Sequence, residues 1–103
     1  MDYRLSIGLN DKITKKQEIA TLEAYKIVVD ILLNNGIGGA TLSDGKGIYK
    51  HNNGDIVIEN TIIVELSFID DISIIYTCIE LLKVALNQES VMLEQITKIV
   101  EYR

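Results

Sequence analysis

The stretch from Gly45 to Lys50 carries the residue types best suited to hold a small phosphate-containing ligand. Its sequence, GKGIYK, offers backbone amides beside glycines, two lysines and the ring of Tyr49. Phosphate groups are bound by amides and cations, and a purine base can stack on an aromatic ring. The competing interpretation is a solvent-facing strand with a bulge, because glycines inside a strand mark a bulge or a close approach to the backbone. Both interpretations stay open on the sequence alone.

A second polar cluster, Asn87-Gln88-Glu89-Ser90, offers amide and hydroxyl groups that could read a base edge or a ribose. A turn between a helix and a strand explains the same residues equally well. Arg4 and Arg103 are the only arginines of the chain. Arginine suits bidentate contacts with phosphate, although a surface arginine needs no ligand to explain it.

The residues that usually perform catalysis are isolated in this sequence. His51 is the only histidine and falls at the tip of a predicted hairpin, where an exposed loop residue is the simpler interpretation. Cys78 falls inside a predicted helix, as a small core residue would. Asp70 and Asp71 precede that helix and are better explained by helix capping than by a metal site. We therefore expect no enzyme, no metal and no cofactor.

A hairpin from Gly38 to Phe68 would position the glycine-lysine stretch. Asn53-Gly54 at its tip predicts a tight primed turn, because both residues tolerate positive φ. The second arm, which starts at Ile56, becomes continuously apolar, as in a strand that is central or covered on both faces.

The flanking segments predict the rest of the fold. Tyr3 to Leu9 alternates apolar and polar residues and predicts a strand. Thr14 and Gln17 form a capping-box pair that predicts a helix start, and Asn34-Asn35-Gly36 predicts its end. Its expected apolar stripe comprises Ile19, Leu22, Tyr25, Val29, Leu32 and Leu33.

A second helix and a last strand complete the predicted chain. Ile72, Ile75, Ile79, Leu82 and Leu86 repeat at helical spacing. Val91 opens a last strand, and the tail from Thr97 to Arg103 alternates as another strand or an extension would. The order predicts an α+β, ferredoxin-like βαββαβ fold, with two helices on one face of an antiparallel sheet and one domain over residues 1–103.

Composition limits the partners. The net charge is −5, whereas non-specific binding to DNA or RNA requires a basic face, so we expect no polymeric nucleic acid. No apolar run approaches the about 20 residues that span a bilayer, so we expect no membrane. A lone cysteine fits a reducing cytoplasm. The uncovered sheet face, together with apolar Ile74, Tyr76 and Val84 off the helix stripe, predicts a homodimer or higher homo-oligomer.

Two resemblances to known families bear on function. At Gly39-Ala40-Thr41 and Lys46-Gly47 the chain resembles the PII-like signalling superfamily, whose fold is ferredoxin-like. Four longer stretches are similar to the first-named Thoeris anti-defence family, small phage proteins that counter a bacterial immune system. These stretches are Ile7-Gly8-Leu9-Asn10-Asp11-Lys12, Thr21-Leu22-Glu23-Ala24-Tyr25-Lys26-Ile27, Gly45-Lys46-Gly47-Ile48-Tyr49 and Asn87-Gln88-Glu89-Ser90-Val91.

The Thoeris resemblance implies a sponge that binds cyclic ADP-ribose signals and sequesters them without cleaving them. Members of that family form dimers that share the ligand pocket, and some also take cyclic oligonucleotides. The protein would then be encoded by a phage or prophage and would act in the cytoplasm of the bacterial host. The ligand-binding residues expected on this interpretation are Tyr49 for the base, Lys46 and Arg103 for the phosphates, Asn87, Gln88 and Ser90 for polar edges, and Asn10.

Two rival functions stay open beside the sponge. One is a PII-like regulatory module that senses a small metabolite and contacts a protein partner through its hairpin. The other is a small enzyme with shared active sites. The lack of a visible catalytic set favours the sponge over the enzyme.

Overall fold

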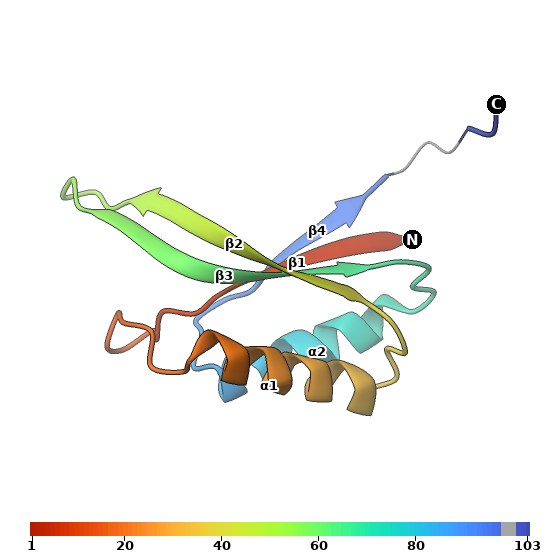
Figure 1. Ribbon diagram of the computed structural model, residues 1–103, viewed down its shortest axis with the longest axis horizontal. Helices are drawn as coiled ribbons and strands as arrows, with labels where there is room; N and C mark the ends of the chain where they lie inside the picture. Colours follow the sequence, from red (N-terminus) through yellow and green to blue (C-terminus); the bar gives the residue numbers. More distant parts are fainter. Residues whose placement is uncertain (98–100) are drawn as a thin grey trace.

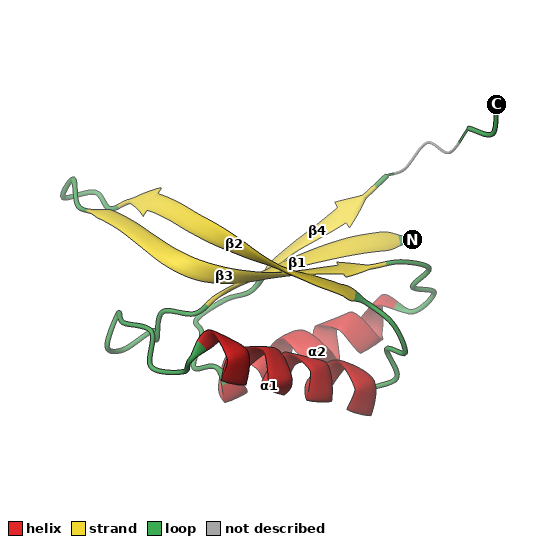
Figure 2. Cartoon of the chain, in the orientation of Figure 1, coloured by secondary structure: helices red, strands yellow, loops and turns green. Residues whose placement is uncertain are grey.

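One antiparallel sheet and a layer of two helices form the molecule (Figure 1). The computed structural model describes residues 1–97 and 101–103. Its elements are β1 (Asp2–Gly8), α1 (Thr21–Asn34), β2 (Thr41–Lys50), β3 (Ile56–Leu66), α2 (Ile72–Ala85) and β4 (Met92–Ile96). The strands have the order β2-β3-β1-β4, and Figure 2 shows both helices beneath one face of the sheet. The expected ferredoxin-like βαββαβ arrangement is confirmed.

The core lies between the sheet and the helices, because alternate residues of a strand point to opposite faces. The buried positions of the sheet are Tyr3, Leu5 and Ile7 in β1 and Ile62, Val64 and Leu66 in β3. The helices contribute Ala24, Val28 and Leu32 from α1 and Ile75, Cys78 and Leu82 from α2. Cys78 is fully buried, as expected for a core residue, and this burial raises the pKa of its thiol. The opposite face of the sheet carries no helix in the part of the chain that the structure describes (Figure 1).

The central hairpin is longer and more regular than expected. β2 and β3 pair without interruption from Thr41↔Glu65 to Lys50↔Ile56, so the predicted bulge at the glycines is absent from this ladder. The predicted close approach is present, because an ideal Cβ on Gly47 would lie 3.1 Å from Thr61 Oγ1. At the tip only Gly54 of the Asn53-Gly54 pair has positive φ, at 94°. The turn is therefore wider than a two-residue primed turn.

The predicted start of the first helix at Thr14 is wrong, since α1 begins at Thr21. Asp11 competes for the capping role, because its Oδ1 accepts from the amides of Ile13 at 2.8 Å and Thr14 at 3.0 Å. Gln17 turns forward and donates to Ile19 O and Thr21 Oγ1 instead of closing the capping box. Residues 9–20 consequently form a long loop between β1 and α1.

The predicted apolar stripe of α1 is rotated relative to the buried face. Ala24, Val28 and Leu32 are buried, whereas Leu22 is 70% and Leu33 57% exposed. The predicted stripe did not include Ala24, which is fully buried.

The second helix follows the prediction more closely. Asp71 caps it by accepting a hydrogen bond from Ser73 N at 2.9 Å, and the contact lowers the pKa of this carboxyl. Tyr76 and Val84 are exposed, as the off-stripe pattern predicted, whereas Ile74 is half-buried and packs against the core. Neither helix in the described part of the chain is long and apolar enough to cross a membrane.

The last strand ends at Ile96. The predicted continuation through the tail includes residues 98–100, which lie outside the described residues. Residues 101–103 are not in a strand.

Candidate functional site

A cavity of about 400 Å³ lies at the end of the sheet where β1 ends and β4 begins. Its floor comes from one sheet face, because the strand register aligns residues that share the side away from the helices. The remaining wall is built by the loop after β1 and by the segment between α2 and β4. The floor residues are Ser6 and Gly8 of β1, Gly47 and Tyr49 of β2, Val57, Glu59 and Thr61 of β3, and Met92 of β4.

Glu59 places a carboxylate across the end of β1. Its Oε2 accepts a hydrogen bond from the backbone amide of Asn10 at 3.0 Å. An ideal Cβ on Gly8 would lie 2.5 Å from Glu59 Oε1, so only a glycine leaves room for this position of the carboxylate. The arrangement presents a half-buried negative charge to the cavity. Such a group binds a cation or accepts hydrogen bonds from a ligand.

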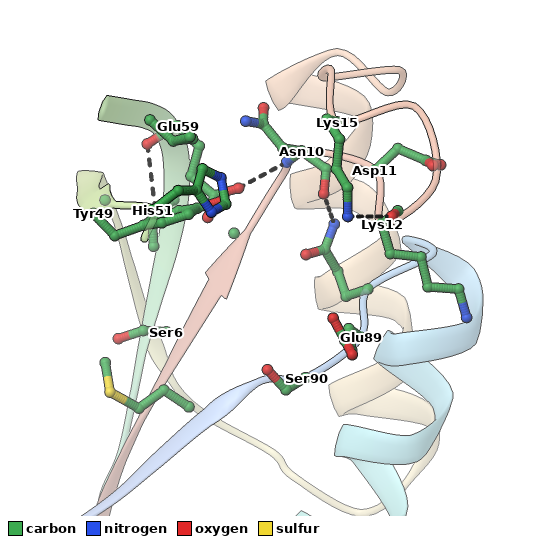
Figure 3. Close-up of a pocket in the computed structure, with 16 residues that line it drawn as sticks. Ser6, Asn10, Asp11, Lys12, Lys15, Tyr49, His51, Glu59, Glu89 and Ser90 are labelled. Carbon is green, nitrogen blue, oxygen red and sulfur yellow. Dashed lines mark hydrogen bonds between the residues drawn. The ribbon is translucent and has the colours of Figure 1, made fainter. Parts of the chain in front are cut away.

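Two aromatic side chains stand at the hairpin end of the cavity. The rings of Tyr49 and His51 make an edge-to-face contact, with centroids 5.2 Å apart and an interplanar angle of 84°. Figure 3 shows both on the same side of the cavity as Glu59, opposite Lys15 and Ser90. Rings in this position can pack against a planar base.

The loop wall is fastened to the end of α2. Asn87 Nδ2 donates to Asp11 Oδ2 at 2.8 Å, and Lys12 N donates to Asn87 O at 3.0 Å. Gln88 Nε2 donates to Asn10 O at 2.8 Å, which joins the ends of β1 and α2. The hydrogen bond from Asn87, followed by those from the amides of Thr14 and Ile13, lowers the pKa of Asp11. Asp11 therefore acts as an ionised anchor of this loop.

Four of the ligand-binding residues predicted from the sequence line the cavity: Asn10, Tyr49, Gln88 and Ser90. The other three do not line it. Lys46 donates to the side chain of Asn60, and Asn87 supports the loop. Arg103 pairs with Glu101 at 2.6 Å, and the C-terminus projects away from the hairpin tip (Figure 1). The role of all seven residues as ligand contacts stays a prediction.

Sequence reasoning missed the charged part of the site. Glu59, Lys12, Lys15 and Glu89 all line the cavity, and His51 does so from the hairpin tip. A signal for Glu59 was present, since it opens the polar stretch Glu59-Asn60-Thr61 between two apolar runs of β3. Its meaning depends on the cross-strand register with Gly8. Among the described residues, no group of three or more His, Cys, Asp or Glu side chains is placed to hold a metal ion.

Comparison with known proteins gives a fold relationship. No protein-family model matches the sequence, and no curated protein matches it. A structure of phage SAM lyase in complex with S-methyl-5'-thioadenosine aligns with a TM-score of 0.70 and 21% identity, over 89% of this chain and 76% of that chain. Phage SAM lyase in the apo state aligns with a TM-score of 0.64 and 23% identity, over 89% and 75%. At these identities the likeness establishes the shared fold.

These neighbours correct one expectation and leave another open. Both are named as an enzyme, which overturns the expectation that the protein is not an enzyme. The lack of a visible nucleophile, base or metal set in the sequence was therefore not a valid ground for excluding catalysis. Both neighbours are named as SAM lyase rather than as a cyclic ADP-ribose sponge, so the resemblance to the Thoeris family stays an expectation.

Proposed function

We propose that this protein binds S-adenosylmethionine (SAM) and breaks it to release S-methyl-5'-thioadenosine. The observation that carries the proposal is the Glu59 carboxylate, fixed by the Asn10 amide in a cavity of about 400 Å³. A cavity of this size is within the usual range for small-molecule sites. The fold shared with phage SAM lyase supports the same substrate class.

The chemistry of a sulfonium explains how a site without a protein nucleophile or a metal would break the substrate. When the bond between sulfur and the four-carbon chain breaks, its electron pair goes to sulfur, which leaves as a neutral thioether. The four-carbon fragment completes its valence in one of two ways: its own carboxylate oxygen forms a bond to the carbon that sulfur leaves, or the neighbouring carbon gives a proton to water and a C=C bond forms. Neither route requires a protein nucleophile or a metal, so the protein contributes binding and orientation. Glu59 would attract the positively charged part of the substrate, and Tyr49 with His51 would pack against its adenine.

The test is release of S-methyl-5'-thioadenosine from SAM, followed by liquid chromatography and mass spectrometry. We expect release by the wild type and a loss of kcat/KM of about tenfold or more in Glu59→Gln, because a charged hydrogen bond contributes roughly 1.5–3 kcal/mol. The amide can still accept from Asn10, so folding should persist. Glu65→Gln is the matched control, since Glu65 lies on the same strand and face but outside the cavity. No release by the wild type would refute the proposed reaction.

Binding of a cyclic ADP-ribose is the second candidate. The observation that favours it is the pair of loop lysines, Lys12 and Lys15, because cations can meet a pyrophosphate while Tyr49 contacts a base. Calorimetric titration with cyclic ADP-ribose decides between the candidates when it is run beside SAM. On either candidate, a phage-encoded role against a bacterial defence, in the host cytoplasm and as a homo-oligomer, belongs to the proposal.

A further inference from the structure

The cavity has the Glu59 carboxylate on its sheet side, and its other wall carries two lysines together with Asp11 and Glu89. Glu59 lies on the sheet side, and Lys15 faces it from the loop (Figure 3). We propose that Lys15 binds the carboxylate of the ligand's amino-acid end while Glu59 attracts its positive part, so that the site selects a zwitterionic ligand. This inference rests on the proposed function, because it names the groups of the same ligand that the two sides recognise.

The Lys15 side chain is held in place by its own loop. Its Nζ donates to Lys12 O at 2.7 Å, and its backbone amide donates to Asp11 O at 2.9 Å. An ammonium has three donors, so two remain for a ligand. Lys15 also has positive φ, 63°, which is an uncommon conformation for a residue with a side chain. Strained backbone of this kind concentrates at binding and catalytic sites.

Of the two lysines that line the cavity, Lys15 is the one whose side chain runs toward Asn10. The carboxylate of Asp11 is occupied, because it accepts from the amides of Ile13 and Thr14 and from the side chain of Asn87. Figure 3 shows the Lys12 side chain extending away from Glu59, whereas Lys15 runs back toward Asn10. The anchoring of this loop to α2 fixes the distance between the two charges before a ligand arrives. Such preorganisation lowers the entropic cost of binding.

If a zwitterion bridges the cavity, the site should bind the substrate and the product with different affinities. The substrate carries the carboxylate and positive charge that the two sides recognise. S-methyl-5'-thioadenosine lacks both and would keep only the contacts to its base and ribose. The substrate should therefore bind more tightly than this product, which helps the product to leave.

The experiment compares three stable ligands that differ at one end. S-adenosylhomocysteine carries the amino-acid end on an uncharged thioether sulfur, so cleavage would have to expel a thiolate, which is a poor leaving group. Its decarboxylated amine differs only by the carboxylate. S-methyl-5'-thioadenosine lacks the whole end. Calorimetry should give the wild type at least tenfold tighter binding of S-adenosylhomocysteine than of the other two. Lys15→Gln should weaken the binding of S-adenosylhomocysteine about tenfold and leave the affinities for the other two ligands unchanged.

Lys16→Gln is the matched control, because it removes the same charge from the same loop at a position that does not line the cavity. It should leave all three affinities unchanged. Equal weakening of all three ligands by Lys15→Gln would overturn the inference and assign Lys15 to loop structure. Unchanged affinities would overturn it as well, while release of S-methyl-5'-thioadenosine from SAM would still support the proposed function. If wild-type protein binds cyclic ADP-ribose alone and Lys15→Gln weakens it, the anion is a phosphate and the carboxylate assignment is wrong.

Discussion

Glu59 can take its position because the neighbouring strand has a glycine beside it. Gly8 has no side chain, and the Glu59 carboxylate occupies the place where a Cβ would project. The amide of Asn10 then holds one carboxylate oxygen at 3.0 Å. The position of the Glu59 carboxylate in the cavity therefore depends on the missing side chain of Gly8.

Replacing that glycine should damage the site without damaging the fold. In Gly8→Ala the new methyl group would displace the flexible end of Glu59 and break its contact with Asn10, while the strand itself accepts alanine. We expect kcat/KM for release of S-methyl-5'-thioadenosine to fall about tenfold, with the melting temperature unchanged or slightly higher. Enzyme kinetics and calorimetry measure the two quantities.

Gly45→Ala provides the control for this substitution. Its Cβ would meet the end of another flexible side chain, Ile63 Cδ1 at 2.9 Å, but outside the cavity. Activity should remain at the wild-type level. A similar loss of activity in both variants would mean that sheet distortion, and not the position of Glu59, explains the effect.

At the scale of elements, the loop between β1 and α1 is fixed by the end of α2. Asp11 and Asn87 join the two segments, and Gln88 adds a third tie through Asn10 O. Asn87 has a φ of 48°, a left-handed conformation that asparagine tolerates better than most residues. The polar turn after α2 thus shapes the loop wall as well as ending the helix.

The stabilisation of this loop by Asp11 should be lost at low pH. The pKa of Asp11 is lowered in the folded protein from 3.8, so its stabilising contribution is present above pH 3.8 and is lost as pH falls through the lower folded value. The amide NMR shifts of Ile13 and Thr14 should follow this titration with a midpoint below pH 3.8. In Asp11→Asn the titration should disappear. A midpoint at or above 3.8 would contradict the proposed anchoring.

The order of elements was predictable because period-two and helical apolar patterns are local properties of the sequence. The start of α1 was not, since Asp11 and the end of α2 stabilise a loop in competition with the Thr14 capping box. The polar turn at Gln88 and Ser90 and the ring of Tyr49 were identified by residue type. Glu59 and Lys15 were missed, because their roles depend on strand register with Gly8 and on a loop conformation that no local pattern reveals.

At the scale of the whole molecule, β2 and β3 project beyond the helix layer (Figure 1). On the face that points toward the helices, Ile62 and Val64 are covered, whereas Ile58 and Ile56 continue the same side of β3 without cover. Ile48 pairs with Ile58 and so shares this face. These three isoleucines are 61–69% exposed and form the arm patch.

The arm patch gives the predicted homo-oligomer a location that can be tested. Complete burial of one large apolar side chain contributes roughly 1.5–3 kcal/mol, so three can offset part of the entropic cost of association. We expect light scattering at micromolar concentration to give at least a dimeric mass for the wild type. Ile58→Lys should shift the mass toward the monomer, because a lysine buried in an apolar contact loses its hydration. Leu22→Lys, at another exposed apolar position, is the control and should retain the wild-type mass. A monomeric wild type would refute the oligomer, and an unchanged mass in Ile58→Lys would place the contact elsewhere on the molecule.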